Sequence, residues 1–552
     1  MQDATPSTPM TTPPPYFAAA PGADIEAPSH VDRLLHAAIG RVTAGISPVA
    51  LSLAFSDWAR HLALSPAKWV RLAEKTGRKT LRFQRYAGQA LLEPGTAACI
   101  APLPQDHRFD APAWRQWPFN YVSQAFLLQQ QWWHNATTGV GGVSPHHEQV
   151  VAFVARQLLD VASPANFIAT NPEVLQATVR EGGRNLWRGW FNLLEDWERH
   201  SSGQPPPGAE RFVPGREVAL TPGRVVYQNR LMELIQYAPA GAEVYAAPLL
   251  IVPAWIMKYY ILDLSPHNSL VAYLVARGHT VFMLSWHNPG SLDGDLDLAD
   301  YLRLGVLEAL DAVRAIVPGQ AVHAVGYCLG GTLLAIAAAH LARSGGDQRL
   351  RSLTLLAAQT DFTEAGELSL FIDESQLDFL KDIMWSRGYL DTRQMAATFQ
   401  LLRSRDLIWS RLAQEYLLGR RPPMTDLMAW NADATRMPYR MHSEYLLKLF
   451  LRNDLAEGRY QVDDKPVSLG DIRVPLFAVA TEADHVAPWR SVYKIHQLVA
   501  SDIEFVLTSG GHNAGIVSEP DHPNRRYRLA RHRPGSRYVP PELWYQATPA
   551  SA

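Results

Sequence analysis

A cysteine enclosed by glycines near the middle of the chain is the feature most suggestive of chemistry. The segment Gly326-Tyr327-Cys328-Leu329-Gly330-Gly331 follows an apolar run at 321–325 and precedes a small-residue helical pattern at 332–342. A strand that ends at Gly-x-nucleophile-x-Gly and turns sharply into a helix exposes the nucleophile. Glycine suits this turn because strand and helix pass too closely to admit side chains. The pattern predicts that Cys328 is a nucleophile, and a thiol there favours chemistry through a thioester.

An acid and a base follow Cys328 in the chain, each after an apolar run. The run 476–480 leads into Thr481-Glu482-Ala483-Asp484-His485, and the run 503–507 leads into Ser509-Gly510-Gly511-His512-Asn513. A cysteine thiol needs a nearby imidazole to become the reactive thiolate, and a carboxylate can fix the tautomer of that imidazole. We therefore predict a triad of Cys328, His512 and Asp484. Glu482 is the alternative carboxylate, and His485 is expected to pack rather than to react.

Backbone N–H groups are expected to stabilise the negative charge that develops on the attacked carbonyl oxygen. One donor is predicted at Leu329, which follows the nucleophile and begins the helix. The second is predicted in the loop after the run 249–252, where Ala254, Trp255 and Ile256 are candidates and Ala254 is preferred. The His-Gly signal that often marks this second donor is absent.

The elements that position these residues read as strands alternating with amphipathic helices. Short apolar, mostly β-branched runs occupy 249–252, 280–285, 321–325, 353–356, 476–480 and 503–507. Such alternation predicts a mostly parallel sheet. Together with the elbow, it indicates an α/β-hydrolase fold over residues 216–552. Residues 362–458 are too long for one crossover helix and are rich in Trp, Leu and Met. They predict a helical cap, whose Trp385, Trp409 and Trp430 are expected to form its own core.

The first part of the chain has a different character. Residues 1–30 are rich in Pro, Thr and Ala and are predicted to be a disordered tail. Residues 31–200 show helical periodicity and predict a mainly α-helical N-terminal domain. Asn171-Pro172-Glu173 has the residue types of a helix start, with an N-cap, a proline and an acidic first turn. Residues 201–215, with several Pro and Gly, read as a linker.

Composition restricts the partners and the compartment. The formal net charge of −2 gives no electrostatic reason to expect nucleic acid. Two cysteines, Cys99 and Cys328, argue against a disulfide framework or a cysteine metal site and suit a reducing cytoplasm. The N-terminus lacks the pattern of a signal peptide, and no apolar stretch reaches the roughly 20 residues of a membrane span. We expect a cytoplasmic protein with no metal and no transmembrane segment.

Further motifs resemble those of polyhydroxyalkanoate synthases. Lys258-Tyr259-Tyr260-Ile261-Leu262-Asp263-Leu264 with Asn268-Ser269-Leu270 is similar to the family's K-Y-Y-I-L-D-L…N-S-L, and Ser285-Trp286-His287-Asn288-Pro289 to its S-W-R-N-P. Other similar segments are Ser163-Pro164-Ala165-Asn166-Phe167, Ala169-Thr170-Asn171-Pro172-Glu173, Thr221-Pro222-Gly223 and Glu233-Leu234-Ile235-Gln236-Tyr237. The resemblance covers roughly residues 48–520. Two departures, His287 for arginine and Asn513 for the commoner isoleucine, leave the substrate preference open.

The resemblance implies a class I type enzyme that polymerises (R)-3-hydroxyacyl-CoA into an intracellular polyester and releases CoA. Cys328 would hold the growing chain as a thioester, and His512 would be the general base. Asp484 would either support His512 or activate the 3-hydroxyl of the incoming unit. The resemblance further implies no cofactor and no second type of subunit, association with polyester granules, and a homodimer. The alternatives are a cysteine-dependent hydrolase (a thioesterase or an intracellular depolymerase) and a granule scaffold without activity, against which the intact triad positions argue.

Overall fold

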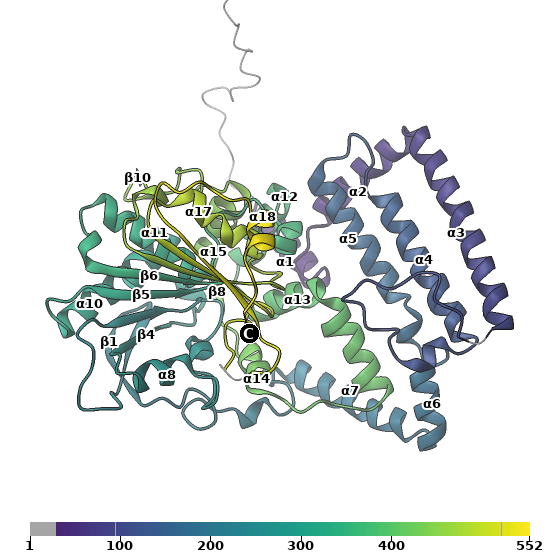
Figure 1. The fold of residues 1–552 in the computed structure, drawn as a ribbon, viewed down its shortest axis with the longest axis horizontal. Helices are drawn as coiled ribbons and strands as arrows, with labels where there is room; N and C mark the ends of the chain where they lie inside the picture. The colour runs from purple at the N-terminus through teal and green to yellow at the C-terminus, as the bar shows by residue number, and fades with distance from the viewer. Residues whose placement is uncertain (1–28, 94, 520–521, 552) are drawn as a thin grey trace, which may run out of the picture.

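The computed structural model describes residues 29–93, 95–519 and 522–551. The chain forms a group of long helices that lies beside an α/β body (Figure 1). Residues 1–28 of the predicted disordered tail lie outside the described residues. His30 already begins the first helix, α1 (His30–Val42).

The helical part consists of seven α-helices. After α1 these are α2 (Pro48–Ala63), α3 (Pro66–Leu92), α4 (Phe119–Thr137), α5 (Pro145–Val161), α6 (Pro172–Glu181) and α7 (Arg184–Ser202). The helix start predicted at Asn171 is confirmed: its side-chain oxygen accepts hydrogen bonds from the backbone N–H groups of Glu173 and Val174 at 3.0 and 3.3 Å. Between α7 and the sheet, the predicted linker contains one short 3-10 turn, η3 (Ala209–Arg211).

A nine-stranded sheet forms the α/β body, in the order β1-β2-β4-β3-β5-β6-β11-β12-β13. The six predicted runs are its parallel strands: β3 (Leu249–Val252), β4 (Val281–Trp286), β5 (Val322–Tyr327), β6 (Leu350–Leu356), β11 (Leu476–Thr481) and β12 (Ile503–Thr508). Three antiparallel strands were not predicted: β1 (Gly223–Gln228), β2 (Met232–Tyr237) and β13 (Tyr527–His532). The α/β-hydrolase architecture that the sequence predicts is therefore present.

Helices pack closely against the centre of this sheet. They include α8 (Leu270–Ala276), α10 (Glu308–Ile316), α11 (Leu329–Arg343) and α16 (Trp489–Tyr493). Helix α11 is buried along almost its whole length, which explains its run of alanines and glycines. Leu250 and Ile251 of β3 and Ala324 of β5 are fully buried, so the sheet holds the elbow of Cys328 rigidly.

The predicted cap region lies between β6 and β11. It contains α12 (Glu374–Trp385), α13 (Thr392–Leu402), α14 (Asp426–Ala432), α15 (Tyr439–Tyr445) and a two-stranded ribbon of β7 (Tyr389–Leu390) and β8 (Met437–Pro438). Trp430 is buried and its indole N–H donates to the Lys258 carbonyl at 2.9 Å. Trp385 instead lies at the surface, where the Arg33 guanidinium covers its ring at 4.7 Å. No helix among the described residues is long and apolar enough to span a membrane.

Candidate active site

Cys328 lies at the turn between β5 and α11, with φ of +52° and ψ of −124°. This backbone conformation is strained for a residue with a side chain, and such strain is common where a nucleophile is presented. The flanking glycines are required by space, as predicted. A Cβ on Gly326 would lie 2.3 Å from Gly331 Cα, and a Cβ on Gly330 would lie 2.1 Å from the Val252 carbonyl oxygen.

His512 and Asp484 form a hydrogen-bonded pair beside Cys328. His512 Nδ1 lies 2.7 Å from Asp484 Oδ2, and the other ring nitrogen is left for the Cys328 side chain, with which His512 also forms a hydrogen bond. The Asp484 carboxylate is fixed in turn, because Oδ1 accepts hydrogen bonds from the backbone N–H groups of Val486 and Ala487 at 2.9 and 2.8 Å. The structure thus brings the three predicted side chains together.

The alternative carboxylate lies elsewhere. Glu482 forms an ion pair with Arg526 at 2.9 Å and accepts a hydrogen bond from the Tyr545 hydroxyl at 3.3 Å. His485 is partly buried, and its Nδ1 has no hydrogen-bond partner in the described structure. Burial lowers the pKa of His485, with Arg403 adding to the effect. The geometry favours Asp484 over Glu482 as the partner of His512.

The charge state of the pair follows from its surroundings. Burial alone would lower the pKa of His512, but the negative charge of Cys328 and the hydrogen bonds to Asp484 and Cys328 outweigh it and raise the pKa to about 10. His512 is therefore favoured as an imidazolium beside the Cys328 sulfur. Tyr327 supports the loop that contains His512, since its buried hydroxyl donates a hydrogen bond to the Asn513 side chain in that loop.

The predicted backbone donors belong to the start of α11 and to the loop after β3. Leu329 is the first residue of α11, so its N–H belongs to the unpaired first turn of the helix. The loop after β3 approaches closely at Gly330, as its contacts with Val252 and Pro253 show. In that loop Ile256, rather than the preferred Ala254, lines the cavity that contains Cys328. Ala254 is buried outside that cavity wall.

An apolar cavity of about 100 Å³ has Cys328 in its wall. Most of the lining comes from the cap, and it includes Phe362, Phe371, Leu380, Phe399, Met437, Tyr445, Leu446 and Phe450. The sequence did not indicate two polar members of this wall, His442 and Tyr445. His442 Nδ1 has no hydrogen-bond partner within the described residues, and burial lowers the pKa of His442 to about 4, so its imidazole is neutral. Burial and the charge of Cys328 raise the pKa of Tyr445, which keeps its hydroxyl protonated.

Other polar groups do not extend the site. Over the described residues, no cluster of three or more His, Cys, Asp or Glu side chains is placed to hold a metal ion. His287, one of the two departures from the family motifs, pairs with Asp293 at 3.1 Å and is not part of the cavity wall. The site that the structure describes thus consists of Cys328, His512 and Asp484, with Cys328 in the wall of an apolar cavity.

An elbow nucleophile with a histidine and an aspartate on later strands defines a protein of the α/β-hydrolase fold, and the family model for that fold matches residues 247–519. Two further models, for the N-terminus of poly-beta-hydroxybutyrate polymerase (PhaC) and for the poly-beta-hydroxybutyrate polymerase N-terminal region, match residues 105–274 and 26–68.

Curated relatives match over most of the chain. A poly(3-hydroxyalkanoate) polymerase of Methylorubrum extorquens is 38% identical over 511 residues, which cover 92% of this chain and 81% of the relative. Poly(3-hydroxyalkanoate) polymerase subunits PhaC of Rhizobium etli and Cupriavidus necator are 39% and 36% identical. Their alignments cover 78% of this chain each, and 68% and 74% of the relatives. The chain belongs to the poly(3-hydroxyalkanoate) polymerase family, as its motifs predicted.

Proposed function

We propose that the protein is an acyltransferase that polymerises (R)-3-hydroxyacyl-CoA into polyhydroxyalkanoate, with Cys328 as the carrier of the growing chain. One observation supports this above all. Cys328, beside the hydrogen-bonded pair of His512 and Asp484, lies in the wall of an apolar cavity, in a chain whose relatives of 36–39% identity are named poly(3-hydroxyalkanoate) polymerases.

In the first step the Cys328 sulfur attacks the thioester carbonyl of the substrate. A C–S bond to Cys328 forms and the C–S bond to CoA breaks, so one thioester replaces another at little cost in free energy. A thiolate is both a good nucleophile and a good leaving group for this exchange. The backbone N–H of Leu329 supports the negative charge on the carbonyl oxygen, with a second N–H from the loop at Ala254–Ile256.

In the second step the 3-hydroxyl of a hydroxyacyl unit attacks the thioester on Cys328: a C–O ester bond forms, the C–S bond to Cys328 breaks, and the sulfur leaves as a thiolate. His512 is neutral when this step begins, because its imidazolium proton went to the departing CoA sulfur in the first step. Acylation has removed the negative charge of the sulfur, which is a main cause of the raised pKa of His512. Without that charge, the lowering of the His512 pKa by burial is opposed less strongly. Neutral His512 is therefore able to accept the hydroxyl proton. The Asp484 carboxylate, bound to Nδ1, stabilises the imidazolium that results. The apolar wall excludes water, which would otherwise hydrolyse the acyl-enzyme.

Product analysis tests this function against its rival. Incubated with 3-hydroxybutyryl-CoA, the purified protein is expected to release CoA and to form insoluble polyester, measured by a thiol assay together with gas chromatography of the methanolysed precipitate. Release of CoA with free 3-hydroxybutyrate as the main product would instead identify a cysteine-dependent hydrolase.

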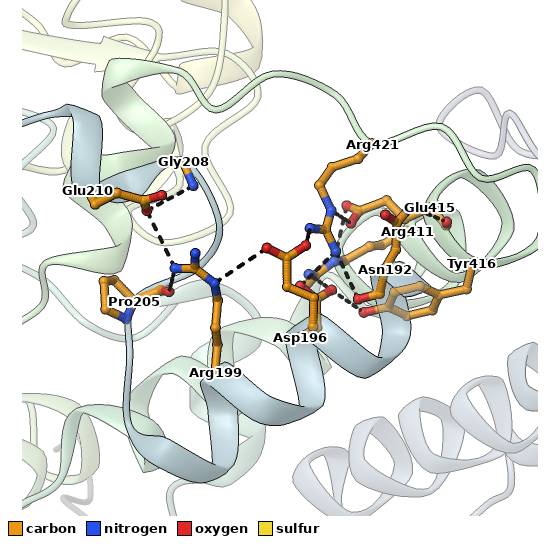
Figure 2. Close-up of polar contacts among 11 residues, drawn as sticks. Asn192, Asp196, Arg199, Pro205, Gly208, Glu210, Arg411, Glu415, Tyr416 and Arg421 are labelled. Atoms are coloured by element: carbon orange, nitrogen blue, oxygen red, sulfur yellow. Dashed lines mark hydrogen bonds and ion pairs between the residues drawn. The ribbon is translucent and has the colours of Figure 1, made fainter. Parts of the chain in front are cut away.

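Association of the protein with the polyester surface is supported by helix α7, whose polar side faces the protein and whose apolar side faces outward. Its polar side faces the protein: Asp196 pairs with Arg411 at 2.6 Å and with Arg421 at 2.8 Å, and accepts a hydrogen bond from the Tyr416 hydroxyl at 2.7 Å (Figure 2). On the same side, Gly189 abuts the Tyr416 carbonyl. The ion pairs fix α7 to the cap segment η10 (Leu412–Leu417).

The opposite side of α7 is aromatic and faces outward. Trp187 and Trp197 are 66% and 73% exposed, and Trp190, Phe191 and Leu194 lie exposed between them. These five residues follow the spacing of one helix face, and we call them the α7 aromatic face. An exposed apolar patch of this kind marks an interaction surface. The water-insoluble polyester that the enzyme itself makes is the partner we propose for it.

Replacing Trp187, Trp190 and Trp197 together with serine should reduce binding of the protein to suspended polyester particles several-fold, because the apolar area available for contact is lost. Co-sedimentation measures the bound fraction. The matched control is Trp69→Ser, which removes an exposed tryptophan from α3. Equal binding by all variants would contradict the proposal. Analytical ultracentrifugation of the same variants tests the proposed homodimer separately, since loss of the dimer would assign this face to a second copy of the chain.

A further inference from the structure

The turn between the first two helices forms part of the wall of the catalytic cavity. Ala44, Gly45 and Ile46 connect α1 to α2, nearly three hundred residues before Cys328, yet they line the same cavity as Cys328. Gly45 has φ of +84° and is buried, whereas Ile46 is half-buried and is the only one of the three with a large side chain. The helical N-terminal part thus contributes directly to the surface that an acyl group on Cys328 would touch.

One buried side chain of the cap holds this turn in place. Gln376 of α12 accepts a hydrogen bond from the Ser47 backbone N–H at 2.8 Å and donates one to the Gly45 carbonyl at 2.7 Å. Gln376 is 4% exposed, so both bonds are shielded from water and costly to break. Its amide therefore clamps the backbone on both sides of Ile46.

Helix α1 is also fixed to α12 along its length. His36 Nδ1 lies 2.7 Å from the Asp382 carboxylate, and a Cβ on Gly40 would lie 2.4 Å from Ile383 Cδ1. The two helices are therefore in close contact at Gly40, where the Ile383 side chain fills the space that a larger residue would need. The turn is a fixed wall of the cavity and not a loose loop over it.

We propose that the α1–α2 turn, through the side chain of Ile46 and the clamp of Gln376, limits the length of the 3-hydroxyacyl group that Cys328 accepts. This rests on the proposed function, in which Cys328 carries the acyl chain. The cavity of about 100 Å³ is small for a ligand pocket, so the 3-substituent of a long acyl group has to displace part of the wall. Ile46 and Gln376 both belong to that wall, and Gln376 also positions Ile46 through its two hydrogen bonds to the backbone of the turn.

The test compares substrates of different length in variants of Ile46. Ile46→Ala should raise the ratio of kcat/KM for 3-hydroxyoctanoyl-CoA to that for 3-hydroxybutyryl-CoA by about 10-fold, since a few methylene groups in an apolar pocket change discrimination by that order. Ile46→Phe should lower the ratio. Gln376→Met, which removes both hydrogen bonds, should raise it, and Gln376→Glu, which keeps the acceptor for the Ser47 N–H, should change it less. Val49→Ala is the matched control, because Val49 is exposed on α2 outside the cavity.

Each outcome decides for or against the proposal. A ratio that moves in opposite directions for Ile46→Ala and Ile46→Phe, with Val49→Ala unchanged, supports it. An unchanged ratio in both Ile46 variants, or an equal loss of kcat/KM on both substrates, overturns it. If Ile46→Ala is too unstable to purify, the fall expected for Ile46→Phe decides alone. Failure of the proposed function would show differently, as absence of an acyl group on Cys328 or as free 3-hydroxy acid in place of polymer, both in the unmodified protein.

Discussion

Replacing Cys328 with alanine should lower CoA release from 3-hydroxybutyryl-CoA by about 10⁴-fold or more and abolish polymer formation, because removal of a nucleophile eliminates the covalent route. The chain supplies its own control in Cys99, the other cysteine. Cys99 lies in the helical part, and burial raises the pKa of its thiol, so it is less readily ionised. Cys99→Ala should retain nearly full activity. Both rates are measured by thiol titration of released CoA.

Alkylation gives a second readout of the same prediction. The raised pKa of His512, about 10, keeps its imidazolium present through neutral pH, and a neighbouring imidazolium favours the thiolate form of a cysteine. Iodoacetamide should therefore modify Cys328 at a rate that changes little between about pH 6 and 9, and in His512→Gln the rate should rise with pH as for an ordinary thiol. Equal labelling of both cysteines, with the same pH dependence, would contradict the assigned pair. So would full CoA release by Cys328→Ala.

The central elements were predictable because their patterns are local. The central parallel strands are largely buried on both faces: the run 249–252 is continuously apolar, and the run 503–507 is interrupted only by the exposed Glu504. Such runs are easy to recognise. The elbow carries its own signature, since Gly326 is required by its contact with Gly331 and Gly330 by its contacts with Val252 and Pro253 of the neighbouring strand end. The loops after β11 and β12 then place Asp484 and His512 by chain order alone.

The edges of the sheet and the cap were not predictable in the same way. Strand β13 (Tyr527–His532) alternates exposed and half-buried residues without an apolar face, and it is defined by its pairing with β12. His442 reaches the cavity because α15 folds over the site, which no local pattern shows. Ile46 is the clearest case, because its place beside Cys328 depends on contacts between α1 and α12, more than three hundred residues apart.

The division of the chain into separate domains stays a prediction for a related reason. The helical part is connected to the cap by the ion pairs of Asp196 with Arg411 and Arg421. It is also connected by the clamp of Gln376 on the α1–α2 turn. These contacts join the helical part and the cap, although the composition of the chain suggests a boundary between the parts. Linker-like composition at 201–215 therefore does not by itself establish independent folding.

Asp484→Asn should reduce elongation by about 10²- to 10⁴-fold, and Glu482→Gln should leave it within about 2-fold of the unmodified enzyme. Asparagine keeps the shape of aspartate but loses the charge that stabilises the His512 imidazolium and favours the wrong tautomer. Glu482 is the matched control because it lies two residues away on the same loop, yet it binds Arg526 at the surface, where an ion pair contributes little. The two variants are compared by polymer yield and CoA release.

Separating the two steps also decides how Asp484 acts. Rapid-quench measurement of the first CoA released reports acylation of Cys328, and steady-state release reports elongation. If Asp484 supports His512, as the 2.7 Å hydrogen bond favours, Asp484→Asn should slow both steps, because the thiolate–imidazolium pair is weakened before substrate arrives. If Asp484 instead activates the 3-hydroxyl, acylation should proceed normally and only elongation should fail. Normal rates in both steps, or a larger loss in Glu482→Gln, would remove Asp484 from the proposed triad.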